Sequence, residues 1–157
     1  MKIQDIIRIL IVCLLLAFPV SATPPIITWE DLRQHDYESG EVQLDIQQFT
    51  QTDIQIAGFI VPLELGDFTE TVSEFLLVPN PLACIHIPPP PPNQMIYVKM
   101  DYEIPLDMDE RGIYVTGRLS ILDTTGEDDF FSYEMIGKTA KKANISYEDP
   151  FDHLISM

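Results

Sequence analysis

The sequence predicts an all-β domain: a small five-stranded, OB-like antiparallel barrel with a short N-terminal helix. Five segments of strand-like sequence follow one another between residues 53 and 140. Two of these segments contain a central glycine, Gly58 and Gly117. Glycine lets a strand coil sharply where a small barrel bends. A two-sheet sandwich is the alternative, because the number of strands alone does not determine topology.

The first 22 residues are typical of a secretory signal peptide. A weakly basic start with Lys2 and Arg8 is followed by an apolar run, Ile9–Phe18, and then by small residues ending at Ala22. The run is too short for a membrane-spanning helix. We therefore predict export to the periplasm with cleavage after Ala22. Lipidation of Cys13 is the less favoured alternative, because the bulky Val12 precedes it.

Cleavage would leave 135 residues, which is enough for one domain with a single core. We divide the chain into the signal peptide (1–22), a leader with a short helix (23–52), the barrel (53–140) and a C-terminal tail (141–157). No later apolar stretch is long enough to cross a bilayer.

The elements are predicted in the following order. In "TWEDLRQ", Thr28 is suited to cap a short helix, Asp31 stands near the capping-box position, and Trp29 and Leu32 would pack the helix on the domain. The next segment, "SGEVQLDI" (39–46), predicts a turn leading into a short strand. The five barrel strands are predicted in "DIQIAGFIVPL" (53–63), "SEFLLVP" (73–79), "QMIYVKM" (94–100), "IYVTGRLSIL" (113–122) and "FFSYEMI" (130–136).

The charge balance argues against nucleic-acid binding. Without the signal peptide the chain has 7 basic and 24 acidic residues, a formal net charge of −17. Such a surface repels phosphate backbones and anionic lipids, whereas it attracts cations or a basic partner. Solubility alone is the simpler interpretation of a diffuse charge.

The most unusual stretch is "ACIHIPPPPPNQ" (83–94). It contains Cys84, the lone cysteine expected after cleavage, and His86 two residues later. In an extended segment these side chains project from the same side, with Cα atoms about 6.5 Å apart. The prolines that follow predict a stiff polyproline II rod, which reduces the entropy lost when an ion or partner is bound.

A thiolate and an imidazole suit zinc first and copper second, so we predict a transition-metal site at Cys84 and His86. Two ligands do not complete a tetrahedral site, and no spacing singles out the others. The candidates are His35, His153, Glu74, Met95 and Met100.

Three alternatives remain open for this stretch. It could dock a protein partner without metal, Cys84 could be a buried structural residue beside a hydrogen-bonded His86, or Cys84 could act in redox chemistry. Redox chemistry is the least favoured, because a resolving cysteine is absent from the sequence. No nucleophile elbow or phosphate-binding loop appears, so we do not expect an enzyme. The residues predicted to dock a partner are Pro88, Pro89, Pro90, Pro91, Asn93 and Gln94.

The strings "IAGFIVPLE", "EFLLVPNPLACIHIPPPPPNQMIYV" and "YVTGRL" resemble a bacterial family of exported proteins known mainly as a domain of unknown function. The resemblance covers roughly Trp29 to Ile121, and its most specific element is the string from Cys84 to Gln94. It implies an OB-type barrel, often encoded near ABC-transporter components that include ones linked to metal supply. From this resemblance we expect a metal-handling accessory protein whose partner is an envelope ABC-transporter component or another periplasmic protein.

Overall fold

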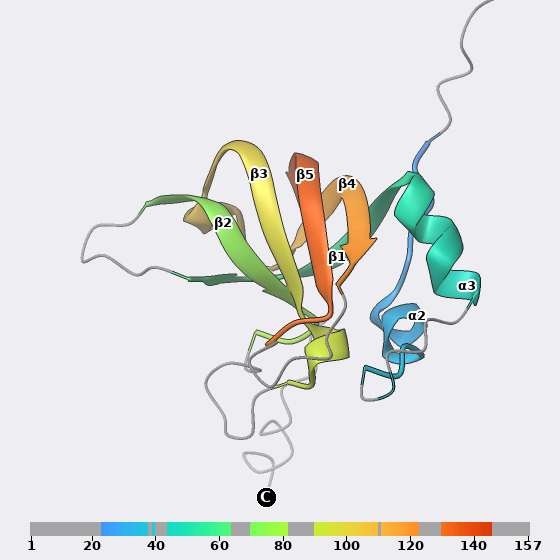
Figure 1. The fold of residues 1–157 in the computed structure, drawn as a ribbon. Helices are drawn as coiled ribbons and strands as arrows, with labels where there is room; N and C mark the ends of the chain where they lie inside the picture. Colours follow the sequence, from blue (N-terminus) through green and yellow to red (C-terminus); the bar gives the residue numbers. More distant parts are fainter. Residues whose placement is uncertain are drawn as a thin grey trace, which may run out of the picture.

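The computed structural model describes residues 23–37, 39, 44–63, 70–81, 90–109, 111–122 and 130–145. These residues form a closed barrel with the strand order β1-β2-β3-β5-β4 (Figure 1). The predicted fold class is confirmed: an all-β, OB-like five-stranded barrel preceded by a short helix. The strands are β1 (Asp53–Pro62), β2 (Thr71–Val78), β3 (Ile96–Pro105), β4 (Ile113–Ile121) and β5 (Tyr133–Lys142).

One pairing in the ring is parallel. β3 runs parallel to β5, from Ile96 opposite Tyr133 to Met100 opposite Gly137, whereas the other four pairings are antiparallel. A closed ring with an odd number of strands cannot alternate direction at every step. Closure of a five-stranded barrel therefore requires at least one parallel pair, and the prediction of an antiparallel barrel needs this correction.

The two predicted bending glycines lie at irregular points of the barrel wall. β1 pairs with β4 as far as Gly58 and then with β2 from Phe59 onward. A Cβ atom on Gly58 would lie 2.9 Å from the carbonyl oxygen of Val78. At Gly117, the register between β4 and β5 shifts in a bulge. Both positions therefore need a residue without a side chain.

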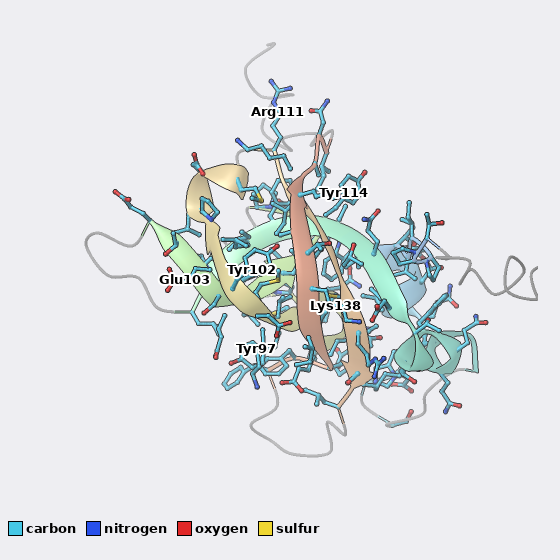
Figure 2. The ribbon with its side chains drawn as sticks, turned by 90° about the horizontal axis from the view of Figure 1, so that it is seen from above. Tyr97, Tyr102, Glu103, Arg111, Tyr114 and Lys138 are labelled. Carbon is cyan, nitrogen blue, oxygen red and sulfur yellow. The ribbon has the colours of Figure 1, made fainter. Side chains whose placement is uncertain are left out.

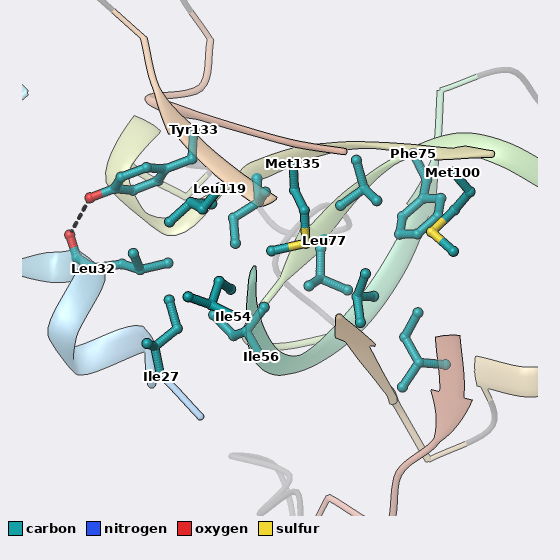
Figure 3. Close-up of a cluster of buried hydrophobic side chains, with 14 of the residues drawn as sticks. Ile27, Leu32, Ile54, Ile56, Phe75, Leu77, Met100, Leu119, Tyr133 and Met135 are labelled. Carbon is teal, nitrogen blue, oxygen red and sulfur yellow. Dashed lines mark hydrogen bonds between the residues drawn. The ribbon is translucent and has the colours of Figure 1, made fainter. Parts of the chain in front are cut away.

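The barrel interior is filled by apolar residues that alternate along the strands, as predicted (Figure 3). Each buried side chain of this size stabilises the fold by about 1.5–3 kcal/mol relative to leaving it exposed. The fully buried members include Ile54, Ile56, Phe75, Leu77, Ile96, Ile104, Ile113, Leu119 and Met135.

The predicted N-terminal helix is confirmed as α2 (Trp29–Arg33). Thr28 and Asp31 form the capping box, with the Thr28 main-chain nitrogen donating to the Asp31 carboxylate at 2.8 Å. Leu32 is fully buried, and the indole nitrogen of Trp29 donates to the Ala57 carbonyl on β1 at 2.6 Å. The helix is thereby joined to one side of the barrel.

The predicted strand in "SGEVQLDI" is wrong. The described part of this segment begins α3 (Leu44–Gln47), which continues into the 3-10 helix η1 (Gln48–Gln51). Ile46 is 1% exposed and belongs to the barrel core. The edge of β1 at Gln55 is paired instead with the leader: the Ile27 nitrogen donates to the Gln55 carbonyl at 2.9 Å, and the Gln55 nitrogen donates to the Pro25 carbonyl at 2.8 Å.

β5 is longer than predicted. It continues to Lys142, so two residues assigned to the tail, 141 and 142, belong to the barrel. On the outer surface, Lys138 of β5 pairs with Asp53 of β1 at 2.7 Å. The hydroxyl of Tyr102 on β3 accepts a hydrogen bond from the Ala140 nitrogen of β5 at 3.1 Å (Figure 2).

The predicted signal peptide and the predicted tail beyond residue 145 lie outside the described residues. Within the described ranges, no helix is both long and apolar enough to cross a membrane.

Candidate functional site

The end of the proline stretch is held against α2. Pro91 is exposed, with φ −65° and ψ 154°, and it leads into the 3-10 helix η2 (Pro92–Gln94). These dihedral angles match the polyproline II conformation that the sequence predicts. Cys84, His86, Pro88 and Pro89 lie outside the described residues, whereas Pro90 is described and half-buried.

Asn93 links η2 to the C-terminal end of α2. Its side chain is buried, and its amide nitrogen donates to the main-chain carbonyls of Arg33 at 3.2 Å and His35 at 2.9 Å. The last carbonyls of a helix have no partner within the helix. Asn93 satisfies one such group, at Arg33, together with the carbonyl of His35 just beyond the helix, and so fixes η2 to the end of α2.

Gln94 makes a second set of contacts with the same helix. Its amide nitrogen donates to the Trp29 carbonyl at 3.2 Å, and its amide oxygen accepts from the Arg33 guanidinium at 3.3 Å. Asn93 and Gln94 are predicted as partner-binding residues, and in the structure both side chains point into the domain. The observed role of these two amides is to anchor the segment.

His35 follows α2 and is 2% exposed. Its ring lies against the ring of Tyr133, with centroids 5.8 Å apart and planes inclined by 54°. Both ring nitrogens are buried, and neither has a hydrogen-bond partner in the part of the chain that the structure describes. A neutral imidazole offers one donor and one acceptor, so both functions of this ring are unsatisfied.

Two more unpaired polar atoms belong to Asn93, which binds the His35 carbonyl, and to Ser132, which precedes Tyr133 in the sequence. The amide oxygen of Asn93 and the hydroxyl of Ser132 are buried and also lack partners among the described residues. The Ser132 main-chain nitrogen donates to the Pro92 carbonyl at 3.0 Å, which brings the start of β5 against η2. We call His35, Asn93 and Ser132 the polar junction, because they lie where α2, η2 and the start of β5 meet.

Tyr133 connects the polar junction to the barrel core. Its hydroxyl donates to the Leu32 carbonyl at 2.8 Å (Figure 3). Burial raises the pKa of Tyr133 far above its usual value, so the hydroxyl stays protonated. This bond attaches α2 to the domain in addition to the bonds of Trp29, Asn93 and Gln94.

The other candidate ligands do not gather around His35. Met95 and Met100 belong to two different apolar clusters, and Glu74 accepts a hydrogen bond from the Tyr97 hydroxyl on the outer surface. His153 lies outside the described residues. Within the described ranges, no group of three or more histidine, cysteine, aspartate or glutamate side chains is arranged to hold a metal ion. Among the described candidates, His35 is the one with buried nitrogen atoms that lack a partner in the described part of the chain.

From the sequence, His35 was one of five candidates for the remaining metal ligands. Its burial beside η2 depends on contacts between segments about sixty positions apart, such as the bond between Asn93 and the His35 carbonyl. The local signal was weak: a histidine directly after a short capped helix.

Comparison with known proteins identifies the family. Residues 29–142 match the family described as "Protein of unknown function (DUF3299)". The chain belongs to the DUF3299 family. A crystal structure of a DUF3299 family protein from Pseudomonas aeruginosa PAO1 is similar in fold, with a TM-score of 0.53 and 24% sequence identity. The similarity covers 82% of this chain and 100% of that one. No curated protein matches this DUF3299 chain.

Proposed function

We propose that this DUF3299 protein is a periplasmic accessory protein that handles a transition metal, zinc before copper, for an envelope ABC transporter. Cys84 and His86 are the proposed metal ligands. Thiolate and imidazole are the donors that zinc and copper(I) prefer, and they stand two positions apart before a run of prolines.

The observation that best supports this proposal is the anchoring of the proline segment. Asn93 and Gln94 bind α2 through buried side chains, so the chain that follows Cys84 and His86 ends at a fixed point of the domain. A ligand-bearing segment tied to a rigid frame loses less conformational entropy when it binds an ion. The acidic surface adds a field that attracts cations.

The test is a zinc titration of the reduced mature protein in competition with a chromophoric chelator. Cys84→Ser and His86→Ala should each lower zinc affinity at least tenfold. Asp101→Asn removes one exposed carboxylate from β3 and should leave affinity within twofold of the parent, which separates a defined site from diffuse acidity. Unchanged affinity in both ligand variants would refute the metal site.

Export is tested separately. Mass spectrometry of protein recovered from the periplasm should give the mass of a chain that begins at Thr23. Elemental analysis of the same sample, purified without chelator, should show zinc.

The alternative function is a metal-free module that docks a protein partner through the proline segment. The exposure and polyproline II backbone of Pro91 favour it, because such a segment suits an aromatic groove on a partner. Pull-down from periplasmic extract with chelator present would support this function if a protein is retained by the parent and lost with Pro91→Ala.

A further inference from the structure

We infer that the outer face of β4 and β5 is a docking surface for a short, acidic segment of a partner protein. The inference starts from the uneven distribution of the basic residues. From residue 23 onward the chain has 24 acidic and 7 basic residues, and six of the seven basic residues lie on β3, β4 and β5 or within two positions of them. These six are Lys99, Arg111, Arg118, Lys138, Lys141 and Lys142. β4 contains no acidic residue, and β5 contains one, Glu134.

The strand register brings basic side chains together around Ile136. Residues that pair directly across neighbouring strands point to the same side of a sheet. Ile136 of β5 pairs with Lys99 of β3 on one side and with Arg118 of β4 on the other. Ile136 is 42% exposed, so this row lies on the outer surface of the barrel. Neighbouring strands are about 4.8 Å apart, so the two cations closely flank an exposed aliphatic side chain.

The same face continues along β4 and β5. Lys141 pairs with Tyr114, which is 36% exposed, and Lys138 lies between this pair and Ile136 in the sequence (Figure 2). We call four of these residues the basic strip: Lys99, Arg118, Lys138 and Lys141. From Ile136 to Lys141 the strand advances by five positions, or about 16 Å. That length matches about five residues of an extended peptide.

Half of the basic strip has no counter-charge in the described structure. Lys99 and Lys138 form ion pairs with carboxylates of β5 and β1, at 2.8 and 2.7 Å. Arg118 and Lys141 are exposed, and neither forms an ion pair with a residue that the structure describes. Like charges at this spacing repel one another, and carboxylates are scarce on this face of an acidic protein. An anionic partner would remove this repulsion.

The composition of the face favours a peptide over other anions. Tyrosine and arginine are enriched in protein interfaces, and here they stand beside an exposed aliphatic side chain. Ile136 and Tyr114 can contact apolar side chains of the segment, while Arg118 can bind a carboxylate through two parallel hydrogen bonds. A bilayer or a long polyanion would extend beyond the strip and meet the field of a chain with net charge −17. A segment of about five residues would contact the strip alone, since charges interact over about 8 Å at physiological salt.

The experiment uses a fluorescein-labelled hexapeptide with two central leucines flanked by glutamates, and a matched peptide with glutamine in place of each glutamate. Fluorescence anisotropy measures the affinity of each peptide for the folded parent chain at low and at high salt. We expect the glutamate peptide to bind at least about tenfold more tightly than the glutamine peptide at low salt, and the difference to shrink at high salt. Chelator is present throughout, so the result does not depend on the proposed metal site.

Three charge-reversal variants locate the binding surface. Arg118→Glu and Lys141→Glu alter the basic strip, whereas Arg33→Glu on α2 changes the net charge equally and is the matched control. Urea unfolding first establishes that each variant is folded. We expect each strip variant to lose at least about fivefold in affinity for the glutamate peptide and Arg33→Glu to stay within about twofold. Equal losses in all three folded variants would overturn the inference, because net charge alone would then control binding.

Two further outcomes would also overturn it. One is a folded parent that does not bind the glutamate peptide, or that binds both peptides equally. The other concerns lipid: the parent could sediment with phosphatidylglycerol-containing vesicles, lose this binding in Arg118→Glu and fail to bind the peptide. That pattern would assign the basic strip to an anionic membrane surface instead of a protein segment.

Discussion

The side-chain amide of Asn93 donates to the main-chain carbonyl of His35 at 2.9 Å, across 58 positions of sequence. This bond joins the end of the proline segment to His35, whose buried ring has no hydrogen-bond partner in the ranges that the structure describes. The anchoring residue Asn93 and the buried His35 therefore lie together where the segment that follows the C-x-H motif returns to the barrel.

Asn93→Ala should lower the free energy of unfolding by about 1–3 kcal/mol, because it leaves the carbonyls of Arg33 and His35 without their side-chain donor. Urea unfolding measures the change. Asn144→Ala is the matched control: Asn144 is exposed and its amide oxygen accepts from the exposed Arg111, so the free energy of unfolding should fall by less than about 0.5 kcal/mol. Equal costs for the two variants would contradict an anchoring role for Asn93.

Tyr133→Phe should lower the free energy of unfolding by about 1–3 kcal/mol, because the buried Leu32 carbonyl loses its hydrogen-bond donor. The variant should also change the pH dependence of stability. Burial raises the pKa of Tyr133 above the ordinary value of 10.0, so above that pH the folded chain holds a proton that the unfolded chain releases. The free energy of unfolding should then fall as pH rises past about 10, by up to about 1.4 kcal/mol per pH unit from this group.

Urea unfolding of the parent and of Tyr133→Phe from pH 8 to 11 tests this slope. The hydrogen bond to Glu74 raises the pKa of Tyr97 as well, but that contribution is the same in both proteins. The difference in the free energy of unfolding between the parent and Tyr133→Phe should therefore become smaller above pH 10. A constant difference across the range would show that Tyr133 does not titrate differently on folding.

Gly117→Ala should be strongly destabilising, by about 3 kcal/mol or more, because the added Cβ would meet the main chain of β5, including the Gly137 Cα at 2.8 Å. Gly137→Ala is the informative comparison. Its nearest neighbour is the sulfur of the flexible Met100 side chain, which can move, so we expect about 1–2 kcal/mol. Thermal or urea unfolding of both variants measures the loss of stability. A larger loss for Gly137→Ala than for Gly117→Ala would contradict the expected clash with the main chain of β5.

Zinc should stabilise the reduced parent chain, because an ion that binds the folded state alone raises the free energy of unfolding by about 2.7 kcal/mol at one hundred times its Kd. The effect should reverse with chelator and be smaller by at least about 1.3 kcal/mol in His86→Ala, because a tenfold loss of affinity leaves zinc at only about ten times the Kd. Magnesium at the same concentration is the control, since it prefers oxygen ligands and would report only on the acidic surface. Equal stabilisation by both ions would argue against a thiolate–imidazole site.

Much of the barrel could be predicted from sequence because its strands are amphipathic over eight to ten residues. The alternation in β1 and β4 identified the buried faces, and Gly58 and Gly117 were correctly placed at irregularities of the wall. The prediction of a strand around Ile46 was wrong, because a few apolar residues do not distinguish a strand from a single helical turn.

The candidate site was less accessible to sequence reasoning. Asn93 and Gln94 were predicted to bind a partner, and their side-chain contacts with α2 had no signal in the local sequence. His35 carried no spacing signal towards Cys84 or His86. Contacts between distant segments have no signature in either segment alone.

The sequence by itself determined the local features: the strand segments, the Thr28 capping box, and a thiol and imidazole placed two positions apart before five prolines. These follow from periodicity, backbone restriction and side-chain chemistry, which act within a few residues. That β3 and β5 run parallel, and that the buried His35 ring has no hydrogen-bond partner among the described residues, depends on tertiary structure. Ring closure and burial depend on which distant segments meet, and that choice is made by the whole chain as it folds.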